Sequence, residues 1–225
     1  MIRSNSPILR RIIGLLLLCV LVCALAGPAL HAADNATITY RRIFKGSNPE
    51  FIEIKVPENG DATIDIRQLS EDAAPQAFPV GPAVRAKILE LTAMLHNFDG
   101  LDLDVHRRIA DLGQKTMRYE NGATVHETHY NYTLNHEATQ LAMIFEGLSQ
   151  QQQDQTLLEQ RLKYDRLGVN DALRQFENDL AQHILPEPDH LLPVLDRIAA
   201  DSRVVDLARQ RARGLAERIR TSQSN

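Results

Sequence analysis

The chain has 225 residues, of which 44% are hydrophobic and 24% are charged, and its formal net charge is −4. This acidic balance argues against non-specific binding of nucleic acid or of anionic membrane surfaces. With no tryptophan and only 5% aromatic residues, the composition also argues against a stacking platform for sugars or bases.

The sequence begins with a basic segment, which is followed by an apolar run and then by helix-breaking residues. Three arginines come first, an apolar run follows over residues 12–26, and Gly27 and Pro28 lead into small residues. This is the order of a secretory signal peptide, and ~15 apolar residues are fewer than the ~20 that a membrane-spanning helix needs. We therefore expect residues 1–32 to be a signal peptide and the protein to be exported, either periplasmic or secreted.

The signal segment leaves several alternatives open. Cleavage after Ala32 falls a few residues beyond the helix break, whereas cleavage after Ala26 fits better the rule of small residues before the cut. An uncleaved membrane anchor over residues 12–30 is one alternative, and lipid attachment at a cysteine is another. The paired arginines before the apolar run also allow a twin-arginine export signal.

Both cysteines, Cys19 and Cys23, lie inside the expected signal peptide. The mature chain is therefore cysteine-free, which excludes disulfides, thiol nucleophiles, thiolate zinc sites and iron–sulfur clusters from it. The 193 residues after position 32 contain 22 Lys and Arg against 29 Asp and Glu, which gives them a formal net charge of −7. A domain of this length has to be stabilised by its hydrophobic core alone.

Alternating apolar and polar residues predict strands in the first part of the mature chain. The alternation covers residues 37–44 and 51–56, and it resumes at 64–67 after the turn residues 57–61. Turn residues between two such runs predict a hairpin. A further short strand is expected at residues 76–80.

A helix is expected next, over residues 83–98, because Pro82 fits a first helical turn and apolar residues follow at helical spacing. These apolar residues are Val84, Ile88, Leu91 and Leu95. We expect this stripe to lie on the sheet. Residues 99–113 are expected to form a connection with a short helix, which Asp104 would cap and Gly113 would end.

A second hairpin is predicted around Asn121-Gly122, which is a strong two-residue turn signal between the expected strands 115–120 and 123–134. After Asn135, a suitable helix cap, the apolar residues keep helical spacing to residue 184, with a weak join at Gly168.

Two further helices are expected over residues 189–200 and 202–220, and the apolar positions of the second are Val205, Leu207, Leu215 and Ile219. The glutamine run 150–153 fits either a helix that stands clear of the core or a frayed joint. Mixed charges at helical spacing are typical of a solvated face with weak ion pairs, and a partner-binding surface is the alternative.

Strands first and helices afterwards predict the α+β class. We expect an antiparallel sheet of about five strands backed by one helix, followed by a C-terminal helical segment. The expected organisation is a signal peptide at 1–32, a sheet domain at 33–134, and a helical segment at 135–225 that packs on the sheet domain as one unit.

Side chains suited to catalysis or metal binding are densest between residues 126 and 137: His126, Glu127, His129, His136 and Glu137. A metalloprotease motif places two histidines four positions apart on one helix face, whereas His126 and His129 lie three apart on an expected strand. Alternation sends these two side chains to opposite faces. We therefore expect surface histidines and no cofactor, with a metal site that recruits His136 as the alternative.

Asp99, Asp102 and Asp104 form a second group. A calcium loop needs oxygen ligands at alternate positions and a glycine at its sharp turn, which residues 99–104 supply only in part, so we expect helix capping and loop solvation instead. The sequence contains no Gly-x-Ser-x-Gly, Ser-x-x-Lys, Walker or dinucleotide-binding glycine pattern. No catalytic residue is therefore predicted.

Three segments carry a resemblance: residues 40–56, Val-Arg-Ala-Lys-Ile at 84–88, and Tyr-Asp-Arg-Leu-Gly-Val-Asn-Asp-Ala-Leu at 164–173. Together they resemble an uncharacterised family of exported bacterial proteins, to which no activity is attached. The order of strand, strand, turn, strand and helix also resembles small bacterial protease-inhibitor domains. That second resemblance covers less than half of the mature chain and transfers no inhibitory residue, and a shared fold does not imply a shared function.

Two classes of function remain. Long amphipathic helices and few catalytic side chains favour a non-catalytic exported protein that binds or scaffolds another exported protein through its helical half, residues 136–220. The alternative is a hydrolase or metal-dependent enzyme that uses His126, His129 or His136. A pocket in which those side chains converge would favour the enzyme, whereas an exposed apolar strip on the helices would favour the binding protein.

Overall fold

The computed structural model describes residues 35–223, so the expected signal peptide and its cleavage positions lie outside the described residues. The strands are β1 (Thr37–Ile43), β2 (Phe51–Pro57), β3 (Ala62–Arg67), β4 (Gln76–Phe78), β5 (Gln114–Asn121) and β6 (Thr124–Tyr130). The α-helices are α2 (Pro82–Met94), α3 (His136–Tyr164), α4 (Val169–Ala181), α5 (Leu192–Ala200) and α6 (Asp206–Gln223), with short 3₁₀ segments η1 (His96–Phe98) and η2 (Pro188–Leu191). None of the helices among these residues is long and apolar enough to cross a membrane.

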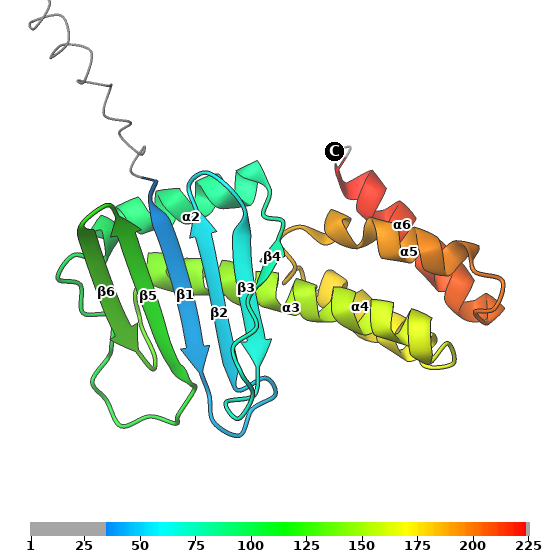
Figure 1. The fold of residues 1–225 in the computed structure, drawn as a ribbon, viewed down its shortest axis with the longest axis horizontal. Coiled ribbons are helices and arrows are strands. Elements are labelled where there is room, and N and C mark those ends of the chain that lie inside the picture. Colours follow the sequence, from blue (N-terminus) through cyan, green and yellow to red (C-terminus); the bar gives the residue numbers. More distant parts are fainter. Residues whose placement is uncertain (1–34, 224–225) are drawn as a thin grey trace, which may run out of the picture. The chain divides into compact units, whose positions relative to one another are not determined.

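The strands form one antiparallel sheet in the order β4-β3-β2-β1-β5-β6, which confirms the α+β class. The sheet has six strands rather than five, because the short strand at β4 pairs with the start of β3. Two helices cover one face rather than one: α2 and the first part of α3 both pack on it (Figure 1). The second helix was missed because its sequence continues without a break into the helical half.

The core between the sheet and these helices follows from strand alternation. Ile38 and Tyr40 of β1 point toward the helices and are fully buried, and Ile52 and Ile54 of β2 lie beside them. The rings of Tyr40 and Phe145 of α3 stack with their centroids 5.1 Å apart. The helix stripe predicted around Leu91 lies on the sheet as expected.

A second hydrophobic core fills the helical half. It joins the last part of α3 to α4, η2, α5 and α6 through fully buried residues such as Leu173, Phe176 and Ile198. The apolar stripe predicted for the last helix is right in its second half, where Leu215 and Ile219 are buried, and wrong at its start, where Val205 is 43% exposed and Leu207 is 60% exposed. Helix α6 begins at Asp206 rather than at 202, and its other buried residues are Ala208, Ala212 and Ala216.

The connection between α2 and β5 contains no helix between residues 99 and 113, contrary to the prediction. The side chain of Asp102 accepts a hydrogen bond from the backbone N–H of Asp104, and Asp104 accepts one from that of His106. Such local bonds to the backbone compete with helix formation. Helix α2 itself ends at Met94, because residues 96–98 follow in the left-handed region.

Candidate functional site

The three histidines of the sequence-based metal hypothesis lie apart, each with its own neighbours. The ring of His126 lies 3.2 Å from the carbonyl oxygen of Asn97, and His129 contacts Glu127 and Thr116 at 3.0 Å each. His136, at the start of α3, pairs with Gln140 of the same helix. In the described part of the chain, no three His, Cys, Asp or Glu side chains form a group that could hold a metal ion.

The aspartate group also lies in a loop and not in a pocket. Asp102 is 2.7 Å from the ring of His106, which raises the pKa of that imidazole and lowers the pKa of the carboxyl. Asp104 accepts hydrogen bonds from the backbone N–H groups of Asn131 and Tyr132, so its role is to hold the loop against the end of β6.

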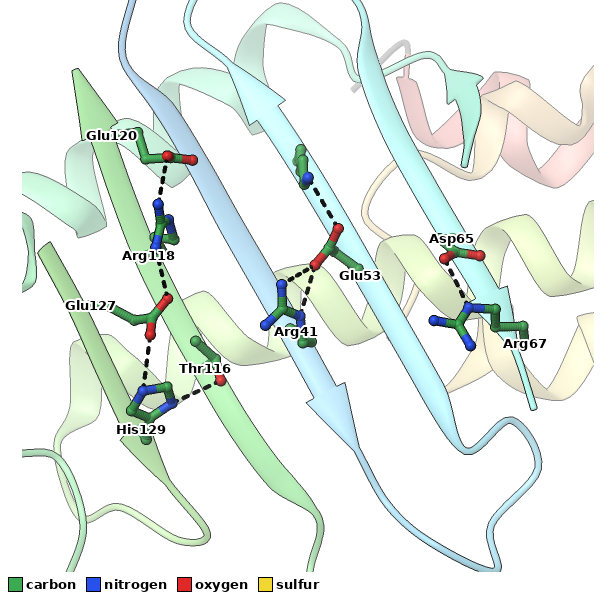
Figure 2. A network of polar contacts seen from close by, with 10 residues as sticks. Arg41, Glu53, Asp65, Arg67, Thr116, Arg118, Glu120, Glu127 and His129 are labelled. Atoms are coloured by element: carbon green, nitrogen blue, oxygen red, sulfur yellow. Dashed lines mark hydrogen bonds and ion pairs between the residues drawn. The ribbon is translucent and has the colours of Figure 1, made fainter. Parts of the chain in front are cut away.

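The sheet face opposite the helices carries charged side chains that pair with one another (Figure 2). Arg41 binds Glu53, Arg67 binds Asp65 at 3.0 Å, and Arg118 bridges Glu120 and Glu127. Each charge drawn on this face has an opposite charge beside it, so the face offers little unbalanced charge to a ligand. Such pairs stabilise a sheet by small amounts.

A groove of about 620 Å³ lies on the helical side, between α2, α3 and the connection from α4 to η2. Leu91 of α2 is buried at its base, whereas Met143 of α3 and Ile184 of the connection are 65% and 38% exposed. Lys87, Gln140, Gln150 and His183 supply polar atoms around this apolar lining. A volume of this size falls in the usual range for ligand pockets, ~300–1,000 Å³.

The connection 182–187 forms one wall of the groove and is held by the end of α4. His183 takes a left-handed conformation with φ 55°, its N–H binds the carbonyl of Leu180, and the N–H of Ile184 binds the carbonyl of Asp179. This is the Schellman ending of a helix, with His183 at the position where glycine is usual. The wall then passes directly over Gly147 of α3, where a β-carbon would have no room.

Glu146, which also lines the groove, is already paired inside the protein. Its carboxylate accepts a hydrogen bond of 2.5 Å from the Tyr40 hydroxyl and lies 3.2 Å from the guanidinium of Arg42. Burial and the charge of Glu146 raise the pKa of Tyr40 well above its usual value. Glu146 is therefore a structural anchor between α3 and β1.

A pair of buried carboxyl groups lies behind the groove, at the joint between the two cores. Asp154 of α3 is 2% exposed and Asp179 of α4 is 9% exposed. Gln150 joins them, because its amide nitrogen lies 3.0 Å from an oxygen of each carboxyl. The second oxygen of Asp154 is buried without a partner among the described residues. Burial, and then the charge of Asp179, raise the pKa of Asp154 from 3.8 to about 7.

Gln151, the next residue of the run 150–153, also makes specific contacts. Gln151 is 4% exposed, its carbonyl oxygen accepts a hydrogen bond of 2.9 Å from the backbone N–H of Glu187, and its amide nitrogen lies 3.3 Å from the ring of His190. Glu187 in turn accepts a hydrogen bond of 2.8 Å from the backbone N–H of Gly81. The first half of the run, Gln150 and Gln151, is thus a packed polar joint, so the helix does not stand clear of the core at this point.

Neither the groove nor the carboxyl pair was predicted from the sequence. A signal for the pair exists in α3: the buried positions Leu141, Phe145, Leu148 and Leu158 continue one stripe, and positions 151 and 154 fill its gap. Polar residues on a buried stripe indicate a buried polar network. The groove has no comparable signal, because its walls come from three separate segments.

Comparison with known proteins finds no matching family model, no matching curated protein and no matching solved structure. The function proposed below therefore rests on the chain's own chemistry and geometry.

Proposed function

We propose that this chain is a non-catalytic exported protein that binds another exported protein, and that the groove between α2, α3 and the connection 182–187 receives apolar side chains of that partner. The observation that carries the proposal is the lining itself: Leu91 closes the base, and Met143 and Ile184 present exposed apolar side chains at the rim. Exposed apolar side chains around a concave surface are characteristic of interaction sites.

Two of the titratable side chains of the groove are already paired, which favours binding over catalysis. Glu146 is engaged by Tyr40 and Arg42, and Lys87 is paired with Glu90 at 3.0 Å. A catalytic site needs an acid, a base or a nucleophile that converge on one reacting atom. The alternative of an enzyme that uses His126, His129 and His136 has less support, because those three side chains have separate neighbours.

The chemistry of the lining suggests an amphipathic helix as the partner's binding element. Methionine side chains adapt to differently shaped apolar anchors, and helix-in-groove binding places such anchors on one helix face. Lys87 of the lining is paired with Glu90, and the one carboxylate of the lining, Glu146, is paired with Arg42. With these charges compensated, apolar anchors rather than a charge would select the partner.

The test is affinity capture with a charge placed in the groove. Met143→Glu should abolish capture of the partner from a periplasmic extract, because a carboxylate at this rim would have to be desolvated against apolar side chains. Leu207→Glu is the matched control, since Leu207 is similarly exposed but lies on α6. Capture that survives Met143→Glu in a stably folded protein would contradict the proposed site.

The enzyme alternative has its own discriminating variant. Simultaneous His126→Ala, His129→Ala and His136→Ala changes should leave capture intact and leave the metal content of the purified protein unchanged. One equivalent of zinc or iron in the unmodified protein that disappears in the triple variant would favour the enzyme instead.

A further inference from the structure

One side chain belongs both to the groove and to the buried carboxyl pair. Gln150 lines the groove, and its amide nitrogen lies 3.0 Å from Asp154 and 3.0 Å from Asp179. An amide N–H₂ group can donate to both carboxyls, but it cannot compensate two adjacent negative charges in a buried position. Gln150 is therefore a direct contact between the carboxyl pair and the lining of the groove.

Asp179 connects the same pair to the groove wall. Its side chain faces Gln150, while its backbone carbonyl accepts the hydrogen bond from the N–H of Ile184. Ile184 and Pro186 form the wall that passes over Gly147. A movement of Asp179 away from α3 would carry the end of α4 and this wall with it.

We propose that Asp154 and Asp179 form a proton-operated latch on the groove: when the pair holds one shared proton the wall at 182–187 is fixed against α3, and when that proton leaves to solvent the wall is released. The buried oxygen of Asp154 that has no partner supports this proposal, because a shared proton would lie on that oxygen. With the proton lost, two carboxylates would face each other away from water, and their repulsion would separate α3 from α4.

The direction of the switch follows from the ionisation of the pair. Burial and the charge of Asp179 raise the pKa of Asp154 to about 7, so the shared proton is held in mildly acidic conditions and lost in mildly basic ones. The effect on partner binding rests on the proposed function, whereas the effect on the wall does not. If the latch and the proposed function both hold, the groove binds its partner more tightly at the lower pH.

Other titratable groups surround the joint, and their effects on the pH response have to be distinguished from that of the pair. They are Glu146 on α3, Lys87 on α2, His183 and Glu187 in the wall, and His190 on η2. Glu187 is bound by the N–H of Gly81, and Glu146 by Tyr40 and Arg42. Each of the two imidazoles is an alternative source of a pH response, so each needs its own variant.

The experiment measures amide hydrogen exchange of the wall in the purified protein without any partner. Protection of the Ile184 and Glu187 amides, corrected for the intrinsic exchange rate, should fall on the order of tenfold between about pH 5.5 and about pH 8.5. In Asp154→Asn, which keeps the shape but carries no charge, protection should stay at the low-pH level throughout. His183→Gln and His190→Gln should each retain the pH response.

The latch would be overturned by wall protection that does not change with pH in the unmodified protein, or by a change that persists in Asp154→Asn. If Asp154→Asn does not fold, Asp179→Asn removes the second charge instead and should give the same constant protection. If the fall in wall protection with rising pH is lost in His183→Gln or His190→Gln, the pH response belongs to that imidazole and the latch is rejected. Because no partner is present, failure of the latch leaves the capture experiment on Met143 as a separate test.

Discussion

The carbonyl oxygen of Ile184 lies directly over Gly147, so close that a β-carbon at position 147 would collide with it and with the ring of Pro186. Glycine in the middle of a helix usually costs stability relative to alanine, about 1 kcal/mol. Its presence in α3 is explained by the close passage of the groove wall.

Gly147→Ala should therefore destabilise the protein by about 1–3 kcal/mol, the usual cost of inserting a group into a packed interior. The backbone of the wall cannot yield as a flexible side chain would. Urea unfolding monitored by circular dichroism gives the free energy of unfolding, and equal or greater stability of the variant would mean that the wall does not lie against α3.

Gly214→Ala is the matched control for the change at position 147. Gly214 is also inside a helix, α6, but nothing lies within 4 Å of a β-carbon placed there. The same substitution should raise the free energy of unfolding by about 0.5–1 kcal/mol through helix propensity alone. Destabilisation by this change would show that a further contact, absent from the described residues, covers the face of α6.

Leu91→Ala should lower the free energy of unfolding by about 2–5 kcal/mol, the range for a truncated core leucine. Leu91 is 1% exposed and packs between α2 and the sheet while it closes the base of the groove. Met94→Ala, three residues later and 53% exposed, should change stability by less than about 0.5 kcal/mol. Comparable losses in the two variants would mean that the stripe of α2 does not face the sheet.

Local sequence preferences were sufficient to predict the hairpins and several helix ends. Gly122, in the predicted turn, has φ 57°, and the side chain of Asn135 accepts a hydrogen bond of 2.8 Å from the N–H of Ala138 at the start of α3. The weak join at Gly168 is the break between α3 and α4. Each of these features depends on residues that are neighbours in the sequence, which is why periodicity and capping preferences could find them.

The groove and the joint depend on residues that are distant in the sequence. Gln150 and Asp154 look like solvated helix residues until α4 brings Asp179 against them, and a single sequence gives no measure of that contact. The start of α6 was predicted too early for a related reason: a turn from 201 to 204 delays the helix start, and helical spacing alone does not fix where a helix begins.

A chain that ends at Leu134 should fail to fold, although all six strands are present in it. The sheet would lose Ala138, Leu141, Phe145 and Leu148 of α3, all of which are buried in its core. Near-ultraviolet circular dichroism should show no fixed aromatic environment for Tyr40, whose ring stacks on Phe145. A cooperative unfolding transition in the shortened chain would show that α2 alone is sufficient to cover the sheet.

The stability of the protein should depend on pH through Asp154. In the unfolded chain this carboxyl releases its proton near its ordinary pKa of 3.8, whereas the folded protein holds it up to about pH 7. Between these values the folded state binds more protons than the unfolded state, so the free energy of unfolding falls as the pH rises from about 4 to about 7.

Asp154→Asn isolates this contribution, because the variant exchanges no proton at position 154 while all other groups remain. Relative to the variant, the unmodified protein should lose about 2–4 kcal/mol of stability from pH 4 to pH 8, since one pKa unit corresponds to about 1.4 kcal/mol. Asp201, whose pKa is lowered to about 2 by Arg203, has the opposite sign, but it is present in both proteins and cancels in the difference. Urea unfolding at a series of pH values measures both curves. Parallel curves would show that Asp154 titrates in the folded protein as it does in the unfolded chain, and the carboxyl pair would then carry no proton at neutral pH.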